Sequence, residues 1–200
     1  MDPKKLRYPR VVLVAILLMA SSANAWGHEA AGSAAGFVSG FTHPIVGWDH
    51  VVAMVAVGIW GALLGAPAIW MLPVLFPLIM AAGGALGVAG VELPAVEAGI
   101  ALSAIVLGAM VAAALRPPLW VALLLVGVFA VFHGHAHGTE LPEAASPLTY
   151  SAGFVVATGL LHVAGIGIGS LVRWPAGRIA VRAVGAAIAL AGVAFLSGFA

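Results

Sequence analysis

The stretch from Pro118 to Glu140, PLWVALLLVGVFAVFHGHAHGTE, decides how the whole sequence is interpreted. Its first part carries no charge and approaches the roughly 20 residues that an α-helix needs to cross a bilayer. It ends in histidines and a glutamate, and such ionisable side chains are costly within a membrane and usually mark an ion or proton pathway. The stretch therefore predicts a membrane-spanning helix with polar chemistry at one end.

The composition supports the same interpretation for the rest of the 200-residue chain. Hydrophobic residues make up 63% and charged residues 8%, whereas a soluble domain has about 25% charged residues. The 8 basic and 7 acidic residues give a net charge of +1, too balanced for a nucleic-acid binder. The absence of cysteine excludes iron–sulfur sites, cysteine-ligated zinc and a cysteine nucleophile.

Residues 1–25 have the pattern of a secretory signal peptide. Basic residues precede the apolar run Val11–Ala20, which is too short to span a bilayer, and residues 23–25 (Ala-Asn-Ala) form a small-residue cleavage site. An uncleaved first transmembrane helix is the alternative. Cleavage would start the mature chain at Trp26, and a terminus with His28 in third position can chelate copper(II) or nickel(II).

Beyond residue 25, apolar segments of spanning length are separated by turn-forming residues. They cover residues 44–64, 68–90, 95–115, 118–137, 148–172 and 178–199. The sequence therefore predicts an all-α polytopic protein in which residues 26–200 form one compact bundle of six transmembrane helices. Glycine pairs at spacing four, such as Gly83/Gly87 and Gly134/Gly138, favour close helix packing.

Charged residues predict the orientation of the bundle in the bacterial inner membrane. The loops after the third and fifth segments are basic, with Arg116, Arg173, Arg178 and Arg182. The loops after the second and fourth segments are acidic, with Glu92, Glu97, Glu140 and Glu143. Because basic loops stay in the cytoplasm, we expect both mature termini on the periplasmic side.

The first ionisable cluster is HPIVGWDH at residues 43–50. We expect Pro44 in the first turn of its helix, where a missing N–H is tolerated, with Thr42 or His43 at the helix start. His50 then lies about 9 Å below the outer end of the helix. Asp49 and His50 point about 100° apart, so both can reach one ion held between neighbouring helices.

The second cluster is FHGHAHGTE at residues 132–140, at the end of the fourth helix. His133, His137 and Glu140 share a helix face at spacings of four and three, whereas His135 points elsewhere. Both clusters lie at a similar depth. Two or three imidazoles with one or two carboxylates suit nickel, cobalt, zinc or copper better than magnesium or calcium.

The predicted metal ligands are the ionisable residues of the two clusters: His43, Asp49, His50, His133, His137 and Glu140. Four further candidates are His28, Met54, Glu97 and His162. A solvated acid at the helix start is the alternative for Glu97, and a helix–helix hydrogen bond is the alternative for His162.

At these residues the chain resembles the HupE/UreJ family of bacterial nickel/cobalt permeases. The family signatures HPxxGxDH and FHGxAHGxE are matched without departure at residues 43–50 and 132–140. The resemblance also covers the signal peptide, the six spans and the chain length. It implies uptake of nickel, sometimes cobalt, for hydrogenase, urease or cobalamin enzymes, with the ion as cargo and no permanent cofactor.

The residues themselves leave other functions open. A membrane haem protein can use paired histidines, and a metal sensor can have the same site. An intramembrane metal hydrolase would want a string such as HExxH, which is absent. The phosphate-binding string GxxxxGK[ST] is also absent, so we expect a secondary permease for a divalent transition-metal ion rather than an ATPase or another enzyme.

Overall fold

The computed structural model describes residues 33–140 and 146–198, and all regular structure in these residues is helical. The elements are α2 (Ser33–Val46), α3 (Trp48–Leu64), α4 (Ala68–Val88), α5 (Val96–Ala112), α6 (Leu119–Thr139), α7 (Pro147–Gly169), the 3-10 helix η3 (Ser170–Arg173) and α8 (Pro175–Leu196). The predicted signal peptide, His28 and Glu143 lie outside the described residues.

Several of these helices are long and apolar enough to cross a membrane. They are α4, α6, α8 and the combined segment Leu148–Arg173. Helices α2 and α3 pass the same test together but are bent by 80° at the break between them. Helix α5 is apolar but has 17 residues, a length of about 25 Å against the roughly 30 Å of a hydrocarbon core. Four or five spans are therefore shown by length, and the sixth stays a prediction.

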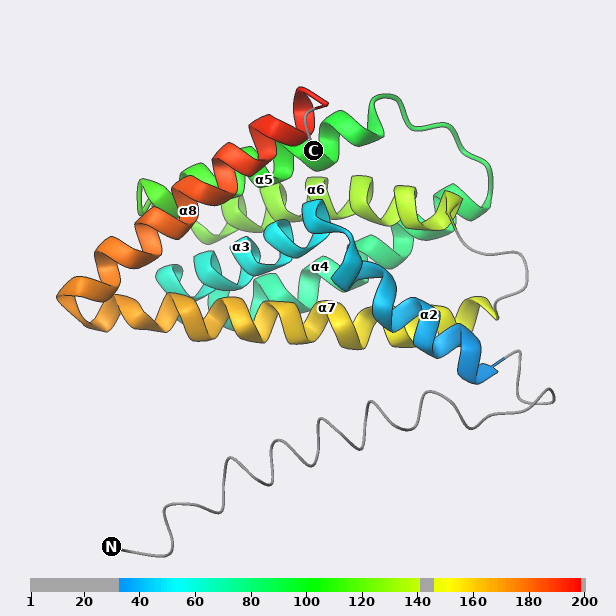
Figure 1. Ribbon diagram of the computed structural model, residues 1–200, viewed down its shortest axis with the longest axis horizontal. Helices are drawn as coiled ribbons and strands as arrows, with labels where there is room; N and C mark the ends of the chain where they lie inside the picture. The colour runs from blue at the N-terminus through cyan, green and yellow to red at the C-terminus, as the bar shows by residue number, and fades with distance from the viewer. Residues whose placement is uncertain (1–32, 141–145, 199–200) are drawn as a thin grey trace, which may run out of the picture.

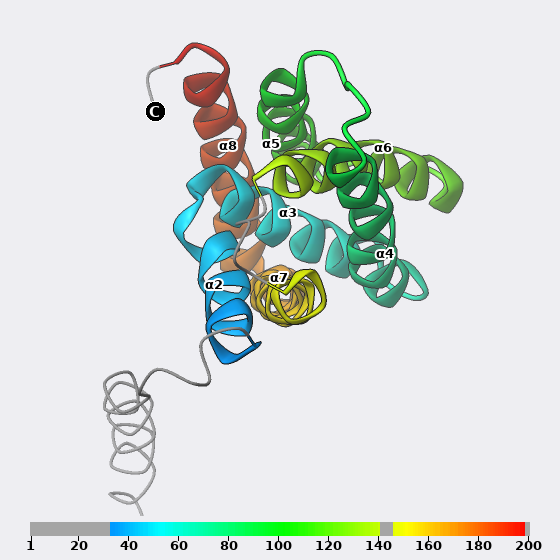
Figure 2. The ribbon, with the colours of Figure 1, turned by 90° about the vertical axis from the view of Figure 1, so that its right-hand side faces the viewer.

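Helix α3 lies at the centre of the bundle (Figure 2). It packs against α7, α5, α4 and α8, and the side chains of Met54, Ile59 and Trp60 on it are fully buried. Around it, α4 runs beside α6 and α5 runs beside α8 (Figure 1). A helix that is apolar on every side is expected in such a central position.

Glycines at the helix crossings allow the backbones to touch. A Cβ atom at Gly134 on α6 would collide with the carbonyl of Met80 on α4, and one at Gly83 would collide with the carbonyl of Val131. At the crossing of α3 and α7, a Cβ atom at Gly58 would collide with the backbone of α7. These contacts confirm the close packing predicted from the glycine spacing.

The predicted start of the first span is wrong. Pro44 does not open a helix but lies near the end of α2, which begins at Ser33. Helix α2 packs along α7, where a Cβ atom at Gly40 would collide with the carbonyl of Tyr150. Because this packing stabilises a helix upstream of the proline, the proline signal alone placed the boundary too late.

The chain breaks instead at Gly47, whose backbone is extended with φ −75° and ψ 104°. Helix α3 starts at Trp48, so Asp49 and His50 lie in its first turn and not about 9 Å along a helix that begins near Pro44. The helix containing His43 and the helix containing His50 therefore run in different directions.

Charged side chains gather at the two ends of the bundle. Nε of Arg182 on α8 donates a hydrogen bond of 2.7 Å to the carbonyl of Ala112, the last residue of α5. Glu97 lies at the opposite end of α5, in its first turn. Glu140 directly follows the last residue of α6. One end of the bundle is therefore basic, and the other is acidic.

The substitution Gly134→Ala tests the crossing of α4 and α6. Its new methyl group meets backbone atoms that cannot move aside, so we expect the free energy of unfolding to fall by about 1–3 kcal/mol. The measurement is thermal unfolding of the purified protein in detergent. Gly127→Ala is the matched control on the same helix, because its Cβ atom would have Leu75 Cδ2 as its nearest neighbour at 3.9 Å. Equal unfolding temperatures for the two variants would contradict the close crossing.

Candidate metal centre

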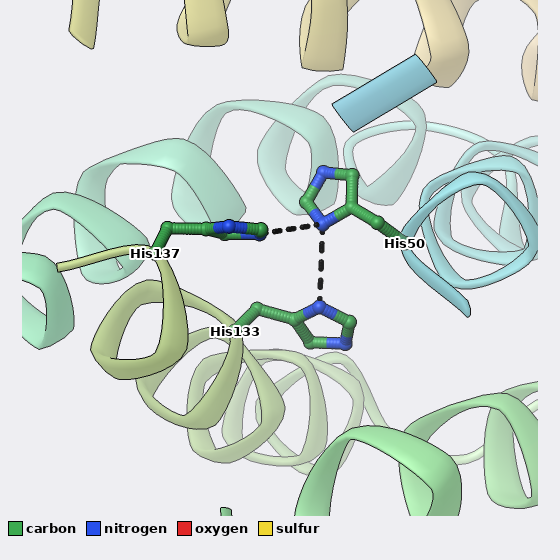
Figure 3. Close-up of side chains that lie close together, drawn as sticks. All are labelled: His50, His133 and His137. Atoms are coloured by element: carbon green, nitrogen blue, oxygen red, sulfur yellow. Dashed lines mark hydrogen bonds between the residues drawn. The ribbon is translucent and has the colours of Figure 1, made fainter. Parts of the chain in front are cut away.

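Three histidines from α3 and α6 meet inside the bundle (Figure 3). Nδ1 of His50 lies 3.3 Å from Nδ1 of His133 and 3.3 Å from Nε2 of His137. His50 and His133 are each 1% exposed. Each of the three residues, which we call the inner trio, offers a ligand nitrogen within 4.8 Å of the other two, a spacing that one metal ion can bridge.

A second group of ligands adjoins the first on its exposed side. Nε2 of His43, from the last turn of α2, lies 3.1 Å from Nδ1 of His137 and 3.3 Å from Oε2 of Glu140. The same carboxylate oxygen is 3.9 Å from Nδ1 of His137. We call His43, His137 and Glu140 the outer trio, and their ligand atoms also lie within 4.8 Å of one another.

His137 belongs to both trios and presents a different nitrogen to each. Its Nδ1 faces His43 and Glu140, and its Nε2 faces His50. The exposed fraction of the side chains falls from 54% at Glu140 to 34% at His43 and 15% at His137. The ligands therefore form a continuous series from the surface to the buried centre.

Two buried hydroxyl groups orient the rings of the inner trio. The hydroxyl group of Ser103 donates a hydrogen bond of 2.6 Å to the carbonyl of Ile100. Its oxygen therefore accepts the hydrogen bond of 2.9 Å from Nε2 of His133. This leaves Nδ1 of His133 without a proton and facing His50. Oγ1 of Thr158 lies 3.4 Å from Nε2 of His50 and can accept a hydrogen bond from that nitrogen in the same way.

Aromatic rings enclose the histidines on two sides. The ring of Phe154 on α7 lies with its centroid 4.4 Å from that of His137 and 5.1 Å from that of His50. The ring of Phe76 on α4 lies 5.6 Å from His133. Both phenylalanines are buried, so the ligands lie in surroundings of low polarity, where an unpaired charge is costly.

The structure does not bring Asp49 into either trio. Asp49 lines a separate hollow between α3, α5 and α8, and Glu97 lines the same hollow. Adjacent residues of a helix point about 100° apart, which allows His50 to face inward while Asp49 faces α5 and α8. The expectation that both would reach one ion is therefore not supported by the ligand distances.

The remaining predicted residues lie outside the two trios. Met54 is fully buried in the apolar core of α3. Nε2 of His135 hydrogen bonds to the carbonyl of Val91 at 2.7 Å, away from the other histidines, as its helix position predicted. His162 is buried on α7 and makes no hydrogen bond.

The chain is similar to known proteins over most of its length. The model of the family described as HupE / UreJ protein matches residues 14–195. The chain belongs to the HupE/UreJ family. Protein HupE of Rhizobium leguminosarum bv. viciae is similar to it, with 48% identity over 163 residues that cover 82% of this chain and 85% of that protein. No solved structure matches the chain.

Membership of the HupE/UreJ family and the apolar helices together identify the chain as a multi-pass membrane protein. The sequence did not indicate Ser103, Thr158 or Phe154 as parts of the centre. None of them lies in either signature stretch, and serine, threonine and phenylalanine are common in apolar helices. Only the packing of α5 and α7 against the histidines shows their place.

Ser103→Ala tests whether the hydroxyl group orients His133. Without its hydrogen bond the imidazole loses its fixed proton position, so we expect affinity for cobalt(II), measured by calorimetric titration of the purified protein, to fall by about tenfold. Ser170→Ala is the matched control, because Ser170 is exposed and bonds only to the carbonyl of Ile166. Equal affinities for the two variants would show that Ser103 has no part in the centre.

Proposed function

We propose that the protein is a secondary permease for the uptake of a divalent transition-metal ion across the bacterial inner membrane. Nickel(II) is the proposed cargo, with cobalt(II) as the second choice. The observation that carries the proposal is the pair of trios joined at His137, which lead from a half-exposed end to the buried centre. Family membership supports it, because the signature stretches supply all five ligand residues of the two trios: His43, His50, His133, His137 and Glu140.

The donor atoms favour borderline ions. The inner trio offers three imidazole nitrogens, and the outer trio offers two imidazole nitrogens and one carboxylate oxygen. Imidazole suits nickel, cobalt, zinc and copper, whereas magnesium and calcium prefer shells of oxygen. The arrangement therefore selects by ligand type against the divalent ions that are most abundant in cells.

The distribution of charge favours transfer over permanent binding. In the outer trio the carboxylate of Glu140 balances part of the double charge of the ion as its hydration water is lost. The inner trio has no carboxylate, so no negative ligand balances the double charge of the ion in these surroundings of low polarity. Three protein ligands also leave coordination positions open. The ion is thus held reversibly, as transport requires.

The hollow lined by Asp49 and Glu97 adds negative charge near the centre. Two carboxylates in one hollow repel each other and attract a cation. Because Asp49 precedes His50 in the chain, this charge acts close to the inner trio. In the proposed function these acids raise the local concentration of the ion and do not bind it together with the histidines.

The membrane potential can supply the driving force. The sequence lacks the GxxxxGK[ST] string of ATP-binding loops. A double charge that crosses a potential of 100 mV, negative inside, gains about 4.6 kcal/mol. Uptake of a divalent cation into the cytoplasm therefore needs no bound nucleotide if the outer trio faces the periplasm.

Reporter fusions test this orientation. The basic end of the bundle should lie in the cytoplasm, so a reporter fused after Arg116 should be active only as a cytoplasmic enzyme. A reporter fused after Glu140 should be active only as a periplasmic one. A periplasmic signal from the fusion after Arg116 would show the opposite orientation, in which the outer trio faces the cytoplasm.

His50→Ala tests the metal centre itself. Loss of the residue that contacts both other members of the inner trio should lower the initial rate of nickel uptake by at least about tenfold in cells. His135→Ala is the matched control, because it removes a buried histidine of α6 that points away from the trios. We expect uptake within about threefold of wild type for this control. The same loss in both variants, at equal amounts of protein in the membrane, would refute the proposed site.

A further inference from the structure

His162 lies deeper in the bundle than the inner trio, near the middle of α7. On this helix it follows Thr158, the residue next to His50, by one turn, or about 6 Å along the axis. It is 1% exposed, and it comes from a different helix than the other histidines. Its position therefore continues the series of ligands away from the exposed end.

Neither ring nitrogen of His162 has a hydrogen-bond partner. Buried polar groups are nearly always hydrogen bonded, because burial without a partner costs free energy. His50, His133 and His135 each make a hydrogen bond to a hydroxyl or carbonyl group. A histidine that served only to join two helices would make such a bond too.

A carbonyl group that lacks its usual helical partner lies close to His162. Pro77 has no N–H, so the carbonyl of Pro73, one turn earlier on α4, cannot form the usual helix bond. This carbonyl faces His162, although the pair does not meet the geometry of a hydrogen bond. An imidazole and a carbonyl oxygen that lacks its usual helix partner therefore lie side by side inside the bundle.

The ring of Phe76 lies beside both this place and the inner trio. Its centroid lies 5.6 Å from the ring of His133 and 5.6 Å from the ring of His162. Both histidines therefore lie against one aromatic side chain. An ion that left the inner trio along Phe76 would meet His162.

We propose that His162 is a further coordination point for the transported ion, with the carbonyl of Pro73 as an oxygen donor beside it. The proposal rests on the proposed function. With one nitrogen and one neutral oxygen, this point binds the ion more weakly than the inner trio. It shortens the distance over which a partly dehydrated ion lacks protein ligands.

The absence of cysteine from the sequence allows a direct test of occupancy. In His162→Cys the only thiol of the protein lies at the proposed point, and a thiolate bound to cobalt(II) gives a charge-transfer absorption that imidazole does not give. We expect this absorption when the purified variant is titrated with cobalt(II). Val163→Cys is the control, because Val163 on α7 is 61% exposed at the surface of the bundle. No difference between the two variants would overturn the proposal.

A pair of substitutions tests the role in transport if the cysteine variant does not fold. His162→Met and His162→Leu have similar volume, but only methionine has a donor atom. We expect His162→Leu to lower the initial rate of nickel uptake by about tenfold and His162→Met by less than about threefold. A structural role would affect both variants alike, and equal rates would therefore overturn the proposal.

His50→Ala separates this inference from the function on which it rests. If His50→Ala abolishes uptake while His162→Met and His162→Leu both transport at the wild-type rate, only the role of His162 is refuted. If His50→Ala transports normally, the proposed function fails and the role of His162 fails with it.

Discussion

Between Val46 and Trp48 the backbone turns by 80°, and the histidines on either side of the turn reach one imidazole as a result. In a continuous helix His43 and His50, seven residues apart, would lie about 10 Å from each other along the axis. The turn instead places each of them against a different nitrogen of His137. The extended backbone of Gly47 forms the break between the two helices. Both trios depend on this break.

The long helices could be predicted from the sequence because lipid leaves few alternatives. An apolar run of about 20 residues must form its backbone hydrogen bonds internally, and the segment predicted at 118–137 is found as α6, Leu119–Thr139. The first span could not be predicted in the same way. Its start depends on packing against α7, and contacts between distant segments leave little local signal. Pro44 pointed to a boundary that this packing overrides.

The candidate centre was predictable where ligands share one helix and less so where they come from several. A spacing of four residues put His133 and His137 on one face of α6, and both contact His50. The direction of Asp49 could not be read from its place beside His50, since one residue turns a helix by about 100°. In the structure this acid lines the same hollow as Glu97.

The shared position of His137 limits how many ions the two trios can hold. A neutral imidazole has one nitrogen with a free electron pair and one that carries the proton. Nδ1 serves the outer trio only when the proton is on Nε2, and Nε2 serves the inner trio only when the proton is on Nδ1. His137 therefore completes one trio at a time. In the proposed transport, an ion that advances past this ring requires the proton to change nitrogens in the opposite direction, so the ions would pass one at a time.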